Sequence, residues 1–373
     1  MKSSDHVAII GGGIIGISTA FYLSRLGHKN VTIYEQCSVG GFSTLKSGGF
    51  LSRTWCDQTE QGDLARASYA LHMELKKEYP ELDFNSVDTY RVNTSMKNGD
   101  QDLKGFVKAP VDWIADDYIT DVKLMFSSRN TAKVSPKLLC DKLLSVAQSK
   151  GVQLKIGKIL GVKKSHGIVT HLLTQNTEKP VPVDAVVVAA GSWSTKFMHE
   201  NFPEYQLPLP RPQIREHSVV LRPPAGVGTE CVYLYHTSSS GTVDPEIYPE
   251  KDGSTVFVCG EQDYTELPDD PQEIQPDISK CNNLITQAGY ASTRLSNAEV
   301  LVAQAAYLPG SPDNLPIIGK VPGSQNVYIA TGHFDWGILN GPATGKCLAE
   351  LILYGETKTC DISPLRPDRF LKN

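Results

Sequence analysis

The sequence lacks several features that mark particular classes of protein. It has no apolar run close to the roughly 20 residues that span a bilayer, so we expect no transmembrane segment. It also has no run of Lys and Arg, and a net charge of -5 over 373 residues gives no basic surface for a polyanion. We therefore expect no nucleic acid partner.

Paired cysteine motifs and targeting signals are also missing. The eight cysteines form no C-x-x-C pair and have no histidine at zinc-finger spacing, which predicts reduced thiols and no metal site. Residues 1–6 lead directly into a strand-like run and a glycine cluster, without the pattern of a cleaved signal peptide. The last residues, 370–373, lack the Ser-Lys-Leu peroxisomal signal. These absences favour a cytoplasmic protein.

The composition is that of an ordinary folded enzyme. Hydrophobic residues make up 40% of the chain and charged residues 21%. A chain of this length and composition can bury one large core, or two cores that share a boundary.

The strongest motif lies near the start of the chain. A short apolar run at 7–10 precedes Gly11, Gly13 and Gly16, which open a segment with helical spacing. A second apolar run ends at Glu35, 19 positions after Gly16. Strand, glycine turn, helix and acidic residue in this order are typical of a parallel sheet that binds a dinucleotide.

Each glycine of the motif has a predicted task. Gly11 permits the tight turn, Gly13 lets the backbone approach a pyrophosphate, and Gly16 allows the helix to pack closely on the strand. The N–H groups at the start of the helix would bind the anion, and Glu35 would accept hydrogen bonds from the adenosine ribose. Further cofactor contacts are predicted at Ile14, Ile15 and Gln36.

The glycine motif alone does not distinguish NAD from FAD, but the following segments do. An NAD-binding sheet usually continues at once with further strand and helix units, whereas here a loop rich in glycine and hydroxyl groups occupies 40–49. A helix is predicted at about 63–79, and the sheet resumes only after residue 130. This interrupted layout is similar to that of glutathione-reductase-like flavoproteins.

Further elements are predicted along the rest of the chain. Ser135 as N-cap and Pro136 at the first helical position predict a helix to about 149. The apolar run at 185–190 indicates a strand buried on both faces. Alternating segments between 211 and 300 are typical of antiparallel strands, and a last helix is predicted from near Pro342 to Gly355.

Three stretches resemble the D-amino acid oxidase and sarcosine oxidase family. Residues 187–194 resemble its apolar strand ending A-A-G-x-W, and residues 311–319 resemble its T-P-D-x-x-P-I-I-G run. Residues 331–346 resemble its C-terminal G-H-x-x-x-G loop and the helix that follows. With the N-terminal motif, these stretches bracket almost the whole chain.

The resemblance implies an α/β fold with two domains. A glutathione-reductase-like Rossmann domain would bind FAD and comprise residues 1–80, 131–210 and 301–373. A second, mainly antiparallel domain would bind the substrate and comprise residues 81–130 and 211–300. The active site would lie where the two domains meet.

The resemblance also places residues around FAD. The loop at 40–49 would wrap the flavin, and the N–H groups at the start of the C-terminal helix would face the pyrimidine ring, where negative charge develops on reduction. Ile159 is equally plausible as an adenine contact and as a core residue. The residues implied as cofactor contacts are Ser43, Thr44, Lys46, Ser47, Gly48, Gly49, Ile159, Ala190, Gly191, Trp193, Gly332, Gly337, Ile338 and Leu339.

Three positions depart from the family pattern. Ala306 stands where sarcosine oxidases have the cysteine that tethers flavin, so FAD is predicted to be held non-covalently. Leu308 and Leu339 stand where D-amino acid oxidases and sarcosine oxidases have cations that anchor the substrate carboxylate. Because a buried carboxylate needs a cationic partner, either another cation, with Arg53 as the first choice, replaces these anchors, or the substrate is not a simple amino acid.

The resemblance implies oxidation of an amine or amino-acid-like substrate. Hydride would pass to flavin N5, and O2 would be the acceptor, giving H2O2. The residues predicted near the flavin ring are Arg53, Tyr248, His333, Asp335 and Trp336; Tyr248 is equally plausible as a packing aromatic. Two alternatives remain open: a flavoprotein with a structural or trafficking role, and a nicotinamide-dependent dehydrogenase.

Overall fold

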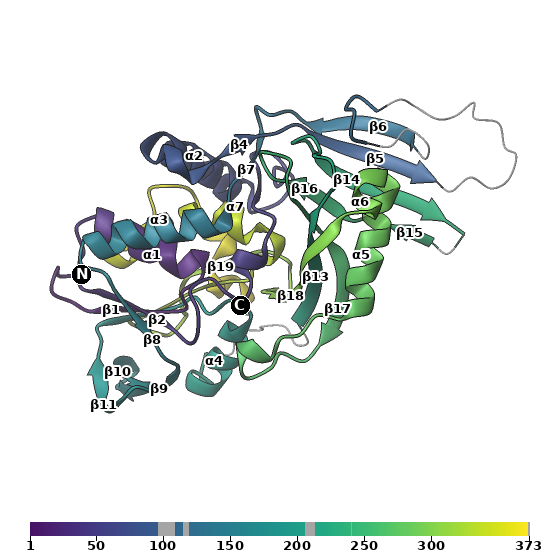
Figure 1. Ribbon diagram of the computed structural model, residues 1–373. Coiled ribbons are helices and arrows are strands. Elements are labelled where there is room, and N and C mark those ends of the chain that lie inside the picture. Colours follow the sequence, from purple (N-terminus) through teal and green to yellow (C-terminus); the bar gives the residue numbers. More distant parts are fainter. Residues whose placement is uncertain (96–108, 115–118, 206–212, 240, 372–373) are drawn as a thin grey trace, which may run out of the picture.

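The elements fall into two groups around one junction. The structure is a computed structural model and describes residues 1–95, 109–114, 119–205, 213–239 and 241–371. In Figure 1, both termini lie with a parallel sheet and its covering helices, and a second group of long strands lies beside them.

The first group is built on a six-stranded sheet with strand order β19-β20-β12-β1-β2-β8. Its strands are β1 (Val7–Ile10), β2 (Val31–Glu35), β8 (Gln153–Ile156), β12 (Ala185–Val188), β19 (Ile317–Lys320) and β20 (Val327–Thr331). Only β19 runs antiparallel to its neighbour. β1, β2 and β12 are buried throughout, as expected for strands covered on both faces.

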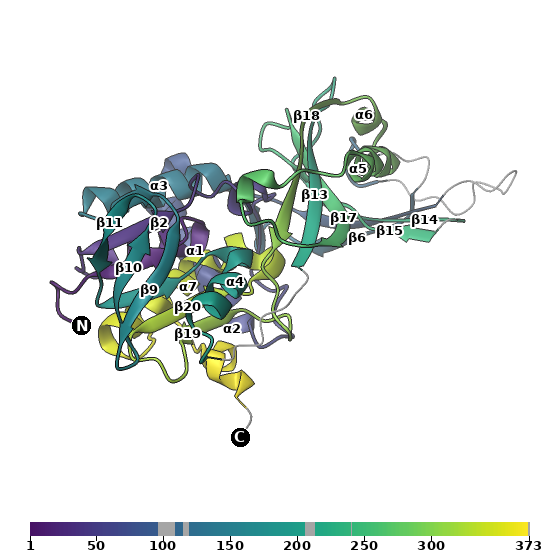
Figure 2. The ribbon, with the colours of Figure 1, turned by 90° about the horizontal axis from the view of Figure 1, so that it is seen from below.

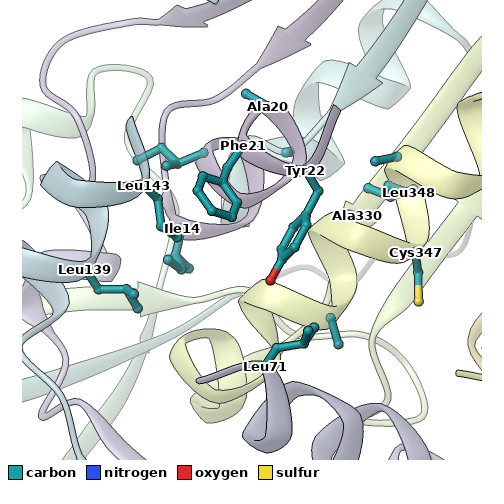
Figure 3. Close-up of a cluster of buried hydrophobic side chains, with 14 of the residues drawn as sticks. Ile14, Ala20, Phe21, Tyr22, Leu71, Leu139, Leu143, Ala330, Cys347 and Leu348 are labelled. Atoms are coloured by element: carbon teal, nitrogen blue, oxygen red, sulfur yellow. The ribbon is translucent and has the colours of Figure 1, made fainter. Parts of the chain in front are cut away.

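Helices cover this sheet. They are α1 (Ile14–Arg25), α2 (Gly62–Glu78), α3 (Pro136–Ser149), α4 (Ser194–Asn201) and α7 (Gly337–Tyr354). Figure 3 shows Phe21 and Tyr22 of α1 between Leu143 of α3 and Leu348 of α7. A Cβ atom on Gly345 of α7 would lie 2.4 Å from the carbonyl carbon of Ser18, so the close contact of α1 with α7 requires glycine there.

The second group is built on an eight-stranded sheet with order β18-β13-β17-β16-β14-β5-β6, in which β15 also pairs with β14. All pairs are antiparallel except β14 with β5. Its strands are β5 (Thr89–Ser95), β6 (Ile119–Phe126), β13 (Gln213–Arg222), β14 (Cys231–Ser238), β15 (Gly241–Val243), β16 (Glu246–Pro249), β17 (Val256–Thr265) and β18 (Glu299–Leu308).

The prediction of strands throughout 211–300 missed two helices, α5 (Ile278–Ala291) and α6 (Thr293–Ser296). Figure 2 shows them on one side of the long strands. Asp277 caps α5 by accepting a hydrogen bond from the Ser279 N–H at 2.8 Å. The apolar positions Cys281, Leu284 and Ala288 have helical spacing, so the signal for α5 was present in the sequence.

Two small sheets complete the fold. One contains β9 (Ile159–Ser165), β10 (Ile168–Thr174) and β11 (Thr177–Pro182), and the other contains β3 (Phe50–Ser52), β4 (Asn85–Ser86) and β7 (Thr131–Lys133). The buried Lys133 ammonium donates to the carbonyls of Tyr248 and Pro249 and to the Glu250 carboxylate at 2.9–3.2 Å. This amine therefore ties the second small sheet to β16.

The two-domain division remains a proposal, with one adjustment. A boundary at 300/301 would cut β18, which pairs with β13 along its length and so belongs with the second sheet. Parts of the proposed domains, 96–108, 115–118 and 206–212, lie outside the described residues.

The C-terminal helix begins earlier than predicted. It starts at Gly337 and contains Pro342, and it ends as predicted at Gly355, whose φ is +81°. Pro342 has no N–H group to donate to the carbonyl of Ile338. That carbonyl instead accepts a hydrogen bond from His72 Nε2 at 3.0 Å, which allows the helix to continue through the proline.

Ser135 provides a test of the local prediction for α3. Its hydroxyl accepts a hydrogen bond from the Leu138 N–H at 3.3 Å, as expected of an N-cap. We expect Ser135→Ala to lower the free energy of unfolding by about 1 kcal/mol, measured by urea denaturation. Ser145→Ala, at an exposed position inside the same helix, is the matched control and should cause no loss. An equal loss in both variants would contradict the capping role.

No helix in the described part of the chain combines the length and apolar character needed to cross a membrane.

Candidate functional site

A cavity of about 690 Å³ lies where the two large sheets meet. Its volume is within the range of ligand pockets. One end lies at the carboxyl ends of β1 and β2 and includes Glu35 and Ile159. The other end includes Glu216, Glu246 and Trp336, so residues of both sheets line one space. Ligands of open α/β sheets bind at the carboxyl ends of the strands.

The glycine turn after β1 brings backbone to this cavity. Gly11 has a φ of +112°, and a Cβ atom there would lie 2.2 Å from the Ala189 carbonyl oxygen. A Cβ atom on Gly16 would lie 2.0 Å from the Gly11 carbonyl oxygen, so both positions require glycine. Gly13 is the N-cap of α1 and has no side chain to cap it. The start of α1 therefore has no side-chain cap from its own N-cap residue; the Ile14 N–H is bonded to the Thr44 hydroxyl, and the N–H groups that follow it are available to a ligand.

Glu35 closes the turn at the end of β2. Its carboxylate accepts hydrogen bonds from the N–H groups of Gly12 at 2.8 Å and Cys37 at 3.0 Å. Burial raises the pKa of this carboxyl, and the backbone hydrogen bonds oppose that shift. Each carboxylate oxygen has a further lone pair, so Glu35 can also accept from ribose hydroxyls.

The loop at 40–49 crosses the cavity and is fixed at several points. The Thr44 hydroxyl accepts from the Ile14 N–H at 3.1 Å. The Ser43 hydroxyl donates to the Tyr307 carbonyl at 3.0 Å, and the Lys46 ammonium donates to the Ala305 carbonyl at 2.8 Å. The loop therefore spans from α1 to β18.

A second helix begins at the same cavity. Gly337 and Ile338 of α7 line it, and the N-cap residue Trp336 makes no side-chain capping bond. Two helix starts thus direct positive N–H groups into one space, which suits a ligand with negative charge at two separated places. His333, just before this helix, bonds through Nε2 to the Thr344 hydroxyl at 3.0 Å, and burial lowers its pKa to about 3. It is therefore neutral.

One face of the eight-stranded sheet forms the remaining wall. The register places Tyr233 opposite Glu246, Glu246 opposite Cys259, and Cys259 opposite Ser218, so these four residues form a row across β14, β16, β17 and β13. All four line the cavity. The Tyr248 hydroxyl lies 2.6 Å from the Tyr233 hydroxyl and donates to the Glu246 carboxylate.

Three carboxyl groups gather at this end. Burial raises the pKa of Glu246 to about 7 and that of Asp335 to about 6. Burial also raises the pKa of Glu216, and the charges of Asp335 and Glu246 raise it further. Among the residues that the structure describes, those that line the cavity include no arginine, and the lysines among them are Lys46, Lys158 and Lys196.

Most of the residues predicted from the sequence lie together on this cavity. Those that line it are Gly11, Gly13, Ile14, Ile15, Glu35, Gln36, Ser43, Thr44, Lys46, Ser47, Gly48, Gly49, Ile159, Ala190, Gly191, Trp193, Tyr248, His333, Asp335, Trp336, Gly337 and Ile338. Ala306 and Leu308, the positions that depart from the family pattern, also line it. Their placement supports these residues as cofactor and substrate contacts.

Four predicted residues do not line the cavity. Gly16 and Gly332 shape the turns beside it, and a Cβ atom on Gly332 would lie 3.2 Å from Ser311 Cβ. Leu339 is 1% exposed and packs in the core below the start of α7. Arg53 is exposed, just beyond β3, and its charge acts on Tyr69 of α2. Arg53 therefore lies outside the cavity lining, and its role as the carboxylate anchor stays a prediction.

The sequence prediction missed several lining residues, among them Trp55, Glu216, Tyr233 and Glu246. Glu246 had a usable signal, because residues two apart on a strand share a face and Tyr248 was already predicted. Glu216 had none, since its neighbours on β13 are also polar and its face depends on pairing with β17 and β18.

The comparisons with known proteins agree with this geometry. A family model for FAD-dependent oxidoreductases, DAO, matches residues 6–351. A Schizosaccharomyces pombe protein with oxidoreductase in its name is 28% identical over 100% of both chains. Glycine oxidase of Bacillus subtilis is 25% identical, over 99% of this chain and 98% of its own.

A solved structure shares the fold. That of glycine oxidase from Geobacillus kaustophilus superposes with a TM-score of 0.80 at 21% identity and covers 99% of each chain. At this identity the likeness concerns the fold, while the family model spans nearly the whole sequence. The chain therefore belongs to the DAO family of FAD-dependent oxidoreductases.

Proposed function

We propose that this protein oxidises an amine or amino-acid-like substrate with non-covalently bound FAD and passes the electrons to O2. The observation that carries the proposal is the single cavity that joins the glycine turn of α1, the start of α7 and the inner face of the second sheet. The first two features suit a dinucleotide, and the third supplies a wall for a small organic substrate.

The residues present fit FAD. The start of α1 would hold the pyrophosphate and Glu35 the adenosine ribose. Gly48 lies against the rings of Tyr248 and Phe257, because a Cβ atom there would lie 2.5 Å from Tyr248 Cδ2. The loop can therefore lie this close to the second sheet only with glycine at this position.

FAD would supply the electron acceptor, taking hydride at N5. The substrate loses a C–H hydride and an N–H proton, and a C=N bond forms. In the net reaction, the amine and O2 would give the imine and H2O2. The chain's own residues bind and orient the amine and exclude water, which is how proximity contributes to such reactions.

The departures from the family pattern bear on the substrate. Leu308 lines the cavity and offers no charge to a carboxylate, and Leu339 lies in the core. Ala306 lines the cavity without a thiol, so no covalent bond to flavin can form from that residue.

The first test is optical and kinetic. The purified full-length chain is expected to be yellow, and an anaerobic screen of amines and both enantiomers of amino acids should find one that bleaches the flavin. Reoxidation by O2 should then yield one H2O2 per substrate, measured with a peroxidase-coupled assay. Bound flavin that no amine reduces would instead favour a structural or trafficking role.

Non-covalent binding makes a separate prediction. Denaturation in guanidinium followed by filtration should release all of the FAD into the filtrate, because Ala306 offers no thiol. The yellow chromophore is measured in both fractions. Flavin that stays with the denatured chain would show a covalent bond from another residue.

A further inference from the structure

Three carboxylates from separate elements meet at the substrate end of the cavity. Glu216 comes from β13, Glu246 from β16, and Asp335 from the 3-10 turn η5 (Phe334–Trp336) that precedes α7. The three groups act on one another, since the charge of Asp335 raises the pKa of both Glu216 and Glu246. They therefore share one site although they are far apart in sequence.

This site lacks a counter-charge in the described part of the chain. None of the ion pairs there includes any of the three carboxylates. Lys46 is bonded to the Ala305 carbonyl, and Lys196 pairs with Asp269. Glu216 and Glu246 are half-buried, and Asp335 is exposed towards the cavity. A ligand that displaces water from this end would leave the three charges without a partner, which is costly unless the ligand itself carries positive charge.

Two of the carboxylates also lack strong hydrogen bonds. The Glu246 carboxylate accepts a hydrogen bond from the Tyr248 hydroxyl. The Glu216 carboxylate has a long and therefore weak hydrogen bond from Gln262 Nε2, at 3.5 Å. Asp335 makes no side-chain hydrogen bond to any described residue, and it is accessible from the cavity. Glu216 and Asp335 therefore have acceptor oxygens free for a ligand.

Aromatic rings surround the same end. The Trp55 ring centroid lies 5.5 Å from that of Trp336 and 4.9 Å from that of Tyr233, and all three line the cavity. Faces of tryptophan and tyrosine attract ammonium groups, most strongly where water is excluded. Among the described residues, no group of three His, Cys, Asp or Glu is arranged to hold a metal ion, so an organic cation fits better.

We propose that the substrate is a diamine or polyamine without a carboxylate, with its distal ammonium held by Glu216 and Asp335 against Trp55 and Trp336. This inference rests on the proposed amine oxidation and narrows its substrate class. The same carboxylates would repel the carboxylate of an amino acid, and Leu308 provides no anchor for it.

The charge of the site predicts how binding depends on pH. The pKa of Asp335 is raised to about 6 and that of Glu246 to about 7, and burial together with these two charges also raises the pKa of Glu216. Tyr233, Tyr248 and Cys259 face these carboxyl groups, have pKa values raised well above their usual range, and stay neutral. Diamines stay doubly protonated at these values. Their affinity should therefore rise from pH 5.5 to 7.5 as the carboxylates ionise.

The test compares four-carbon probes with the FAD-loaded full-length enzyme. Isothermal titration calorimetry without turnover gives dissociation constants for butane-1,4-diamine, butan-1-amine and 4-aminobutanoate. We expect the diamine to bind at least about tenfold more tightly than 4-aminobutanoate, with butan-1-amine between them. The diamine, the monoamine and the amino acid are also compared at chain lengths of three, five and six carbons. If at every length the amino acid binds as well as the diamine, the inference is wrong.

Variants of single carboxylates test which residues bind the diamine. Glu216→Gln and Asp335→Asn should each weaken diamine binding about tenfold, flatten its pH dependence and leave 4-aminobutanoate binding unchanged or stronger. Glu299→Gln is the matched control, because this exposed carboxylate of β18 pairs with Arg222 at 2.9 Å, outside the cavity. Equal effects in all three variants would overturn the assignment.

The results that would refute the proposed oxidase function differ from those that would refute the diamine site. Absence of FAD, or flavin that no amine bleaches, would refute amine oxidation whatever the order of binding. A flavin that amino acids reduce faster than diamines would leave the oxidase function in place and refute the diamine site.

Discussion

Replacing Gly16 with alanine is expected to leave the purified protein nearly free of flavin. The new Cβ atom would lie 2.0 Å from the Gly11 carbonyl oxygen and 3.2 Å from Ile9 Cγ2. Helix and strand must then separate, at a cost of up to about 3 kcal/mol. The N–H groups at the start of α1 would no longer converge with the loop at 40–49. We expect FAD affinity to fall at least about 100-fold, measured by titrating apoprotein with FAD.

Two further variants keep this result interpretable. Gly13→Ala places a methyl group 3.2 Å from the Thr44 hydroxyl oxygen, its nearest neighbour, so the chain should fold while the space for a pyrophosphate is filled. Gly226→Ala is the control, because its Cβ would lie 3.8 Å from the nearest atom at an exposed site. Circular dichroism reports folding in each case. If folded Gly16→Ala and Gly13→Ala bound FAD like the parent, the cofactor would not lie on this turn.

The cofactor half of the site was largely predictable from the sequence because its determinants are local. Gly11, Gly13 and Glu35 act through a turn and a neighbouring strand, within a segment that a short pattern describes. The same holds for α3, whose first residues Ser135 and Pro136 fix its start. Signals of this kind can be recognised in a single sequence because they depend on residues that are close together in it.

The substrate wall was not predictable because it depends on pairing over long distances. Glu216 faces the cavity only through the register of β13 with β17 and β18, more than 40 residues away. A shift by one residue would turn it to the opposite face. Arg53 shows the complementary limit: Trp55, two residues further on, lines the cavity, whereas the Arg53 side chain is exposed outside it, and sequence proximity to the flavin loop does not reveal that difference.

The start of α7 was misplaced because an interior proline normally ends a helix. Pro342 is tolerated because α2 supplies the missing partners: His72 Nε2 lies 3.0 Å from the Ile338 carbonyl oxygen and 3.1 Å from that of Leu339. The Ala343 N–H also donates to the Ser68 hydroxyl of α2, at 3.0 Å. These contacts between α2 and α7 lie next to the first turn of α7, which lines the cavity.

Replacing His72 with leucine is therefore expected to destabilise the FAD-loaded protein by about 3 kcal/mol. The change leaves the buried carbonyls of Ile338 and Leu339 without this donor, and each such group costs roughly 1–3 kcal/mol. Urea denaturation measures the loss. A weaker FAD affinity should accompany it, because the first turn of α7 lines the cavity.

The pH dependence of the free energy of unfolding tests the role of His72 independently. Burial lowers the pKa of His72 from 6.5 to about 4, so between these values the unfolded chain takes up the proton first. The stability that the neutral ring contributes is thus present above pH 6.5 and is lost as the pH falls towards 4. His72→Leu should make this loss shallower, and an unchanged slope would show that the ring is not buried and neutral.

A double-mutant cycle with Pro342→Ala tests the reason for the effect. Alanine at 342 restores an N–H group that can donate to the Ile338 carbonyl, so His72→Leu should cost at least about 1 kcal/mol less in that background than in the parent. The coupling is specific, since a general packing defect at His72 would cost the same in both backgrounds. Additive losses would therefore mean that the histidine stabilises α7 by packing alone, and that the proline is accommodated by some other contact.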